Sequence, residues 1–164
     1  MRSVHAFGAG VLLATTLGAS AAETPEAIAA KGETVLLEVH AIGAQLYDCK
    51  ADASGKLAWR FREPIASLVH DGQTVGRHYA GPSWDVGGSV VMGKVVAHAP
   101  GASAKDIAWL KLDVSDRRGD GPLKEATTVQ RVNTVGGNLD GGCETAGDIR
   151  AEPYSADYVF LRKG

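Results

Sequence analysis

The sequence is poor in cysteine, proline, aromatic residues and net charge. Of 164 residues, 2 are cysteines, 6 are prolines and 6% are aromatic. The 17 basic residues nearly balance the 19 acidic ones, and a net charge of −2 argues against nucleic-acid binding, which depends on clustered Lys and Arg. Beyond the first 22 residues, no apolar run approaches membrane-spanning length and no long helical periodicity occurs. These absences direct attention to a β-rich globular chain.

Glycine is the residue in excess, with 21 in the 164-residue chain, against an average near 7%. The apolar fraction of 45% and the charged fraction of 22% are ordinary for a globular protein. This composition excludes a disordered tail, a coiled coil and a collagen-like chain. The length fits one domain, which we expect to span residues 23–164.

Residues 1–22 have the organisation of a secretory signal peptide. Arg2 supplies a positive start, residues 6–18 form an apolar segment, and small residues permit cleavage after Ala21 or Ala22. The alternative is a retained membrane anchor, for which the apolar segment is short. We therefore expect an exported protein, periplasmic or extracellular, with no membrane span in its mature chain.

Export determines how the two cysteines, Cys49 and Cys143, are interpreted. An even number of cysteines in an oxidising compartment predicts a disulfide between them. Two free buried thiols are the alternative. The spacing is unlike C-x-x-C and no histidine is close to either cysteine in sequence, which argues against a metal site.

The mature chain reads as short extended runs separated by glycine-containing turns. Leu57, Trp59 and Phe61 alternate with other residues at the period of two that is typical of a strand with one buried face. We expect Pro64 to end that strand and Gly93 to mark a bulge. Further runs occupy residues 35–40, 45–49, 89–97, 107–112, 127–134 and 158–161. The pattern predicts an all-β fold: a single-domain antiparallel sandwich or barrel with long Gly-rich loops.

Several motifs occur in order along the mature chain. They are Tyr47-Asp48-Cys49, Trp59, the segment 76–84 containing HYAGPSW, Gly88–Val91, Ala108–Leu110, the segment 129–137 containing QRVNTVGG, Cys143, and Tyr154–Phe160. In this combination the chain resembles the family known as domain of unknown function 3455, found in exported bacterial and fungal proteins. The resemblance implies a secreted β-rich domain and supplies no activity. Gly87 departs from the family pattern, which tends to have an acidic residue there, so a ligand or base role at that position is in doubt.

The densest polar and aromatic cluster contains His78, Tyr79 and Trp84, around a Gly-Pro turn. One interpretation is a ligand site, with an aromatic ring stacking on a sugar or an apolar molecule and with His78 hydrogen-bonding or titrating. The other is structural, with Trp84 closing one end of the fold and His78 bonded to a backbone carbonyl.

A second polar group contains Arg131 and Asn133, which strand alternation places on one face. A buried Arg131 could pair with a carboxylate such as Asp85, or it could bind an anionic ligand in a cleft. The loop 136–142 could hold an anion through its backbone amides, but it lacks a P-loop lysine, and a plain flexible loop is the alternative.

Catalytic and metal-binding motifs are weak. Ser83, His78 and Asp85 are close in sequence, but there is no G-x-S-x-G. His70, His78, Asp71 and Asp85 lack the H-x-H or H-E-x-x-H spacing of metal ligands. No metal and no cofactor are therefore expected.

Three functions stay open. The first is a non-catalytic exported module that binds a glycan or another cell-envelope ligand through His78, Tyr79, Trp84, Arg131 and Asn133. The second is a structural or stress-related exported protein whose polar residues serve only the fold. The third is a hydrolase that uses His78 and a carboxylate such as Asp85, although the sequence leans against an enzyme.

Overall fold

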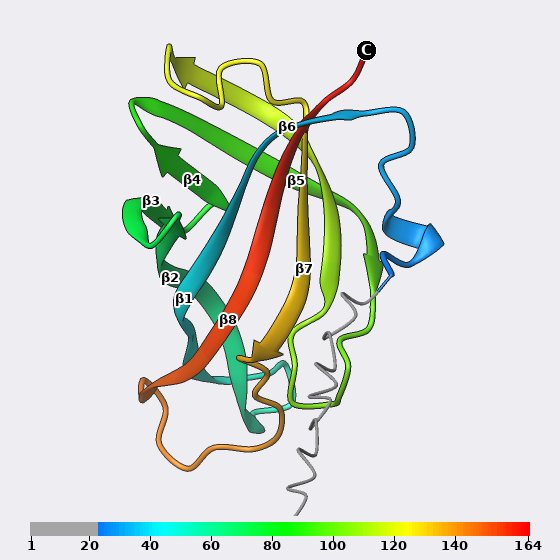
Figure 1. Cartoon of the computed structure of the whole chain (residues 1–164). Helices are drawn as coiled ribbons and strands as arrows, with labels where there is room; N and C mark the ends of the chain where they lie inside the picture. The colour runs from blue at the N-terminus through cyan, green and yellow to red at the C-terminus, as the bar shows by residue number, and fades with distance from the viewer. Residues whose placement is uncertain (1–22) are drawn as a thin grey trace, which may run out of the picture.

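Alternating inward and outward side chains build eight strands, each antiparallel to its neighbours in the chain. The computed structural model describes residues 23–164, so the predicted signal peptide lies outside the described residues. The strands are β1 (Thr34–Ala51), β2 (Leu57–His70), β3 (Gln73–Tyr79), β4 (Ser83–Val86), β5 (Ser89–Ala99), β6 (Trp109–Gly119), β7 (Thr128–Gly136) and β8 (Ile149–Arg162). Because β8 also pairs with β1, the sheet closes into a barrel (Figure 1). The all-β prediction is confirmed, and of its two forms the barrel is the one adopted.

The barrel interior is a packed core. Eight strands enclose a space that side chains can fill, or that can hold one small ligand. The largest fully buried members are Trp84, Tyr158 and Phe160, with Leu68 and Leu112 also excluded from solvent. Their burial against one another supplies the main hydrophobic stabilisation of the fold.

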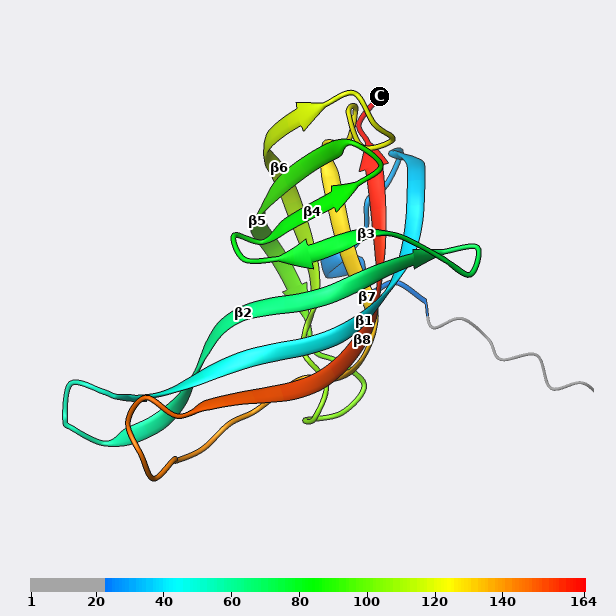
Figure 2. The same cartoon turned by 90° about the vertical axis from the view of Figure 1, so that its left-hand side faces the viewer.

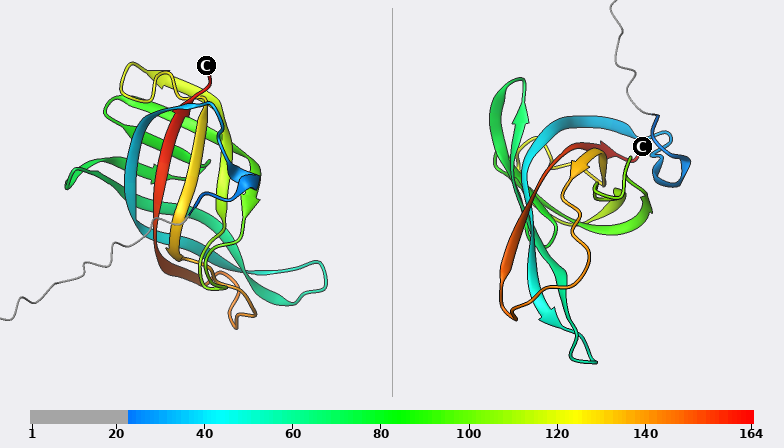
Figure 3. Two further views of the ribbon diagram at one scale, coloured as in Figure 1. Left: turned by 45° about the vertical axis from the view of Figure 1, so that its right-hand side comes forward. Right: turned by 90° about the horizontal axis from the view of Figure 1, so that it is seen from below.

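A second cluster lies on the outside of the wall. The 3-10 helix η1 (Glu26–Ile28) rests against β5 and β6 (Figure 3), and Ile28 is buried against Trp109 and Val132. The Gln130 side-chain amide donates to the Ile28 carbonyl at 2.6 Å. The segment before β1 therefore covers outward-facing apolar residues of the barrel.

The β1–β2 hairpin and the start of β8 extend well beyond the barrel and form an arm (Figure 2). Cys49 of β1 is bonded to Cys143 in the loop 137–148 that precedes β8, which confirms the predicted disulfide. The Trp59 amide also donates to the Gly141 carbonyl at 3.1 Å. The Gly-rich loop is thus fastened to the arm.

Two strands are longer than the sequence predicted. Residues 35–40 and 45–49 belong to one continuous strand, and β2 runs through Pro64 instead of ending there. Pro64 pairs with Gln45 of β1, but its other side has no partner strand because pairing with β3 begins only at Ala66. A missing backbone N–H is tolerated at such an edge. The bulge predicted at Gly93 is confirmed by a register shift there.

The short strands β3 and β4 leave part of the wall open. β3 pairs with β2 only over Ala66–His70, and β4 pairs with β5 only over Ser89–Met92. The first half of β2 and the second half of β5 therefore face each other without an intervening strand. This interruption positions the cavity described next.

Candidate functional site

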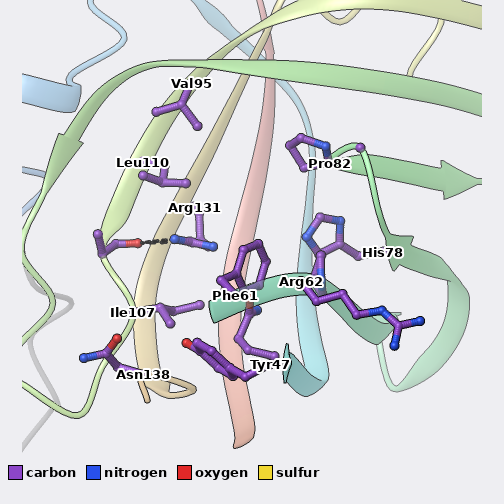
Figure 4. A pocket seen from close by; sticks show the side chains of 14 residues that line it. Tyr47, Phe61, Arg62, His78, Pro82, Val95, Ile107, Leu110, Arg131 and Asn138 are labelled. Carbon is purple, nitrogen blue, oxygen red and sulfur yellow. Dashed lines mark hydrogen bonds between the residues drawn. The ribbon is translucent and has the colours of Figure 1, made fainter. Parts of the chain in front are cut away.

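A pocket of about 390 Å³ opens where the barrel wall is interrupted; we call it the side pocket (Figure 4). It is lined by Gln45, Tyr47, Phe61, Arg62, Pro64, His78, Gly81, Pro82, Val95, Ile107, Ala108, Leu110, Arg131 and Asn138. These residues come from β1, β2, β3, β5, β6 and β7 and from the loops beside them. The set is mainly apolar and contains no Asp or Glu.

The rim of the side pocket exposes large apolar side chains. Phe61 and Val95 are among the most exposed large hydrophobic residues of the described chain. Tyr47 meets Phe61 edge to face, with ring centroids 5.8 Å apart, and its hydroxyl donates to the Gly137 carbonyl at 2.8 Å. Burial raises the pKa of Tyr47, so it stays a neutral phenol. The arm therefore contributes an apolar wall that is fixed to the Gly-rich loop.

His78 lines the back of the side pocket as a neutral imidazole. Its ring stacks on Trp84 at 4.6 Å and lies 4.9 Å from the Tyr158 ring. Nδ1 is 2.8 Å from the Ser83 carbonyl, which can only accept, so Nδ1 carries the proton and Nε2 is left as an acceptor. Burial lowers the pKa of His78 to about 4, and the nearby charge of Arg131 adds to that effect.

The depressed pKa of His78 predicts acid sensitivity. As pH falls from about 6.5 to about 4, the unfolded chain protonates His78 and the folded chain does not, so the free energy of unfolding should fall by about 3 kcal/mol. His78→Asn keeps a donor for Ser83 but cannot titrate in this range. Urea unfolding at a series of pH values in that range gives the free energy of unfolding at each pH. This free energy should fall less steeply with falling pH in H78N than in the wild type; an equal pH dependence would contradict the assignment of His78 as the titrating group.

Arg131 is the second residue of the side pocket that the sequence singled out. Its Nε and Nη2 both donate to the Ala108 carbonyl, at 3.0 and 2.8 Å (Figure 4). Within residues 23–164 no carboxylate lies within 4.0 Å of it, whereas the other lining cation, Arg62, pairs with Asp48 and Glu63. Arg131 is therefore a half-buried cation that no acidic side chain of the described residues neutralises.

Of the two alternatives that the sequence left open for Arg131, the pair with Asp85 does not form. Asp85 lies on the outer face of β4 and pairs with Arg77 at 3.3 Å, because alternation along β4 turns Trp84 into the barrel and its neighbour outward. The same geometry separates Asp85 from His78, whose Nδ1 bonds to Ser83. No bond joins His78 and Asp85 as the hydrolase hypothesis requires.

The remaining predicted residues lie outside the side pocket. Trp84 is only 1% exposed and packs behind His78 in the core. Tyr79 is on the outer face, where Arg77 lies 5.0 Å above its ring. Asn133 donates to Asp157 at 2.8 Å, also on the outer face.

Arg131 and Asn133 do not share a face as alternation predicted. The register between β7 and β8 shifts between Val132 and Val135. Asn133 takes a left-handed φ of 51°, a conformation that asparagine tolerates better than most residues. The bulge turns Asn133 outward while Arg131 stays inside.

Gln45, Tyr47 and Phe61 line the side pocket and were not proposed from the sequence. Gln45 is 2% exposed, and its Nε2 has no hydrogen-bond partner. A polar residue in an apolar strand run was the available signal, because a buried amide needs partners. That Gln45 lines the side pocket follows from the pairing of β1 with β2 and β8, which the sequence did not show.

Residues 23–164 contain no group of three His, Cys, Asp or Glu side chains placed to hold a metal ion. Over the same residues, no helix has the length and apolar character needed to cross a membrane.

The chain belongs to the family described as protein of unknown function (DUF3455), whose model matches residues 29–162. This range includes all eight strands and every residue of the side pocket. No curated protein and no solved structure matched the chain. The family confirms the resemblance seen in the sequence and assigns no activity.

Proposed function

We propose that this member of the family is an exported, non-catalytic barrel that binds one small, mainly apolar molecule in the side pocket. The observation that carries the proposal is the side pocket itself, an open cavity of about 390 Å³ lined mainly by apolar side chains in an otherwise packed barrel. Ligand sites are concave and mostly apolar, with a few polar groups.

The size of the side pocket limits its occupant. A cavity of about 150 Å³ accepts benzene, so about 390 Å³ accommodates roughly 15 non-hydrogen atoms. This favours a small molecule over a polymer. The glycan hypothesis placed sugar stacking at the cluster of His78, Tyr79 and Trp84, but Trp84 is buried in the core and Tyr79 lies on the outer face. We therefore propose a small apolar ligand rather than a glycan.

Export is part of the proposal. The Cys49–Cys143 disulfide supports an oxidising compartment, because such bonds are rare in reducing ones. The composition of residues 1–22 predicts a signal peptide, which agrees with that compartment.

A purely structural role explains the side pocket less well. A partly buried cation without an acidic partner and a buried amide nitrogen without an acceptor both cost stability. Large apolar side chains at an open rim add nothing to the core. Polar and apolar side chains that cost stability or add none to the fold are typical of a binding site.

Filling the side pocket should abolish binding. Val95 lines it and is 48% exposed, so Val95→Trp should place an indole in the opening at little cost to the fold. The adjacent Val96 is 50% exposed and does not line the pocket, which makes Val96→Trp the matched control. We expect the affinity for octan-1-ol, a neutral apolar probe, to fall at least about tenfold in V95W and to be retained in V96W.

The measurement is a titration followed by amide chemical shifts in two-dimensional NMR. Shifts in the wild type should cluster at β2, β5 and the turn at residues 80–82. No saturable shift there in the wild type with octan-1-ol or with octanoate, or equal binding of octan-1-ol by V95W and V96W, would overturn the proposed function.

A further inference from the structure

We infer that the ligand of the side pocket is an amphipathic carboxylate, with its carboxylate on Arg131 and its apolar body against the walls from β2 and β5. This inference rests on the proposed function and specifies the chemistry of its ligand. It begins from the charges of the lining: no Asp or Glu, and two arginines of which only Arg62 is paired with acids. The side pocket therefore holds one uncompensated positive charge.

The geometry of Arg131 leaves a defined edge for an anion. Nε and Nη2 both donate to one oxygen, that of Ala108, so one side edge of the planar guanidinium is occupied and its orientation is fixed. The end edge, formed by Nη1 and the second hydrogen of Nη2, meets no carboxylate and no backbone carbonyl among the described residues, and the Tyr158 hydroxyl lies within hydrogen-bonding reach of the guanidinium. Two parallel N–H groups at such an edge match the two oxygens of a carboxylate.

A second side-chain donor lines the side pocket. The unpartnered Nε2 belongs to Gln45, which is almost fully buried. A Cβ built on Gly137 would be 3.1 Å from Gln45 Cγ and 3.2 Å from Ile107 Cγ2, so Gln45 lies beside the residue that precedes Ala108. An anion on Arg131 would supply the acceptor that this amide lacks.

His78 limits the charge of the ligand. As a neutral imidazole with Nε2 as an acceptor, it adds no positive charge to the side pocket. One unpaired cation balances one negative charge, whereas a phosphate monoester would bring nearly two into an apolar cavity. A monoanion with an apolar body therefore fits the lining better than a phosphorylated ligand.

Three probes with one apolar chain separate the proposals: octanoate, octan-1-ol and the octylammonium ion. At neutral pH the wild type should bind octanoate at least about tenfold more tightly than octan-1-ol, since hydrogen bonds to a charged group are worth about 1.5–3 kcal/mol. Octylammonium should bind most weakly, because its charge is repelled by Arg131. Amide-shift titrations and calorimetry measure all three affinities.

Arg131→Met tests the residue directly. Replacing a poorly paired buried charge by an apolar side chain of similar length is often neutral or stabilising, so R131M should fold. In R131M the affinities for octanoate and octan-1-ol should converge. Arg77→Met, which removes a charge from the outer face, is the control and should keep the preference for octanoate.

The outcomes distinguish the two proposals. If octan-1-ol binds at the side pocket as tightly as octanoate, or if octylammonium binds best, the carboxylate inference is overturned while the proposed function stands. If R131M keeps the octanoate preference, Arg131 is not the anion site and the inference also fails. If none of the three probes binds, the proposed function itself fails.

Discussion

Replacing Cys49 and Cys143 together by alanine should lower the free energy of unfolding by about 4–5 kcal/mol. The bond joins residues 94 positions apart, and in the chain-entropy model the stabilisation grows with the size of the closed loop. For a domain of this size the melting temperature should fall by roughly 10–20 °C. Chemical denaturation of the wild type and the double variant gives both the free energy and its slope.

The position of the bond predicts where the effect appears. It fastens the loop 137–148 to the arm, and Gly137 of that loop accepts the Tyr47 hydroxyl at the side pocket. Loss of the bond should therefore weaken octan-1-ol binding as well as stability. Reductant added to the wild type should reproduce both changes and should leave the double variant unaffected. Unchanged unfolding in the double variant would show that the arm is held by its other contacts alone.

The sequence predicted the parts of the fold that depend on local pattern. The strand around Trp59, the bulge at Gly93 and the Cys49–Cys143 bond follow from residue type, spacing or cysteine count, and they are confirmed. The buried face expected at Leu57, Trp59 and Phe61 is wrong, because Phe61 is 56% exposed at the rim of the side pocket. The strand end predicted at Pro64 is wrong because a proline's cost depends on which edge of the strand it occupies. That edge is set by where the pairing with β3 stops, at Ala66, which the residues around Pro64 do not reveal.

The candidate site was predictable only in part, for a related reason. His78 and Arg131 stood out as polar residues in apolar strands, and both line the side pocket. Asn133 turns outward because a bulge interrupts the alternation, and Asp85 finds Arg77 instead of Arg131 because cross-strand neighbours are decided by register. Gln45 lines the side pocket because β1 pairs with both β2 and β8, and β8 lies far from β1 in the sequence.

Trp84→Ala should lower the free energy of unfolding by about 3–5 kcal/mol, the usual cost of removing a buried aromatic side chain. The indole is 1% exposed, stacks on His78, and meets Tyr158 and Phe160 edge to face at 5.3 and 6.0 Å. Urea unfolding of W84A against the wild type measures the loss.

Trp84→Phe separates packing from hydrogen bonding. The indole N–H of Trp84 is buried without a partner, so phenylalanine gives up no hydrogen bond and relieves one unsatisfied donor. We expect W84F to lose less than half of what W84A loses, and Trp59→Ala, on the half-buried arm, to lose less than W84A. A W84A variant that keeps its stability but no longer binds octan-1-ol would instead make Trp84 a ligand contact. Because Trp84 is buried behind His78, we expect W84A to lose stability, which would mean that Trp84 supports the pocket wall and does not touch the ligand.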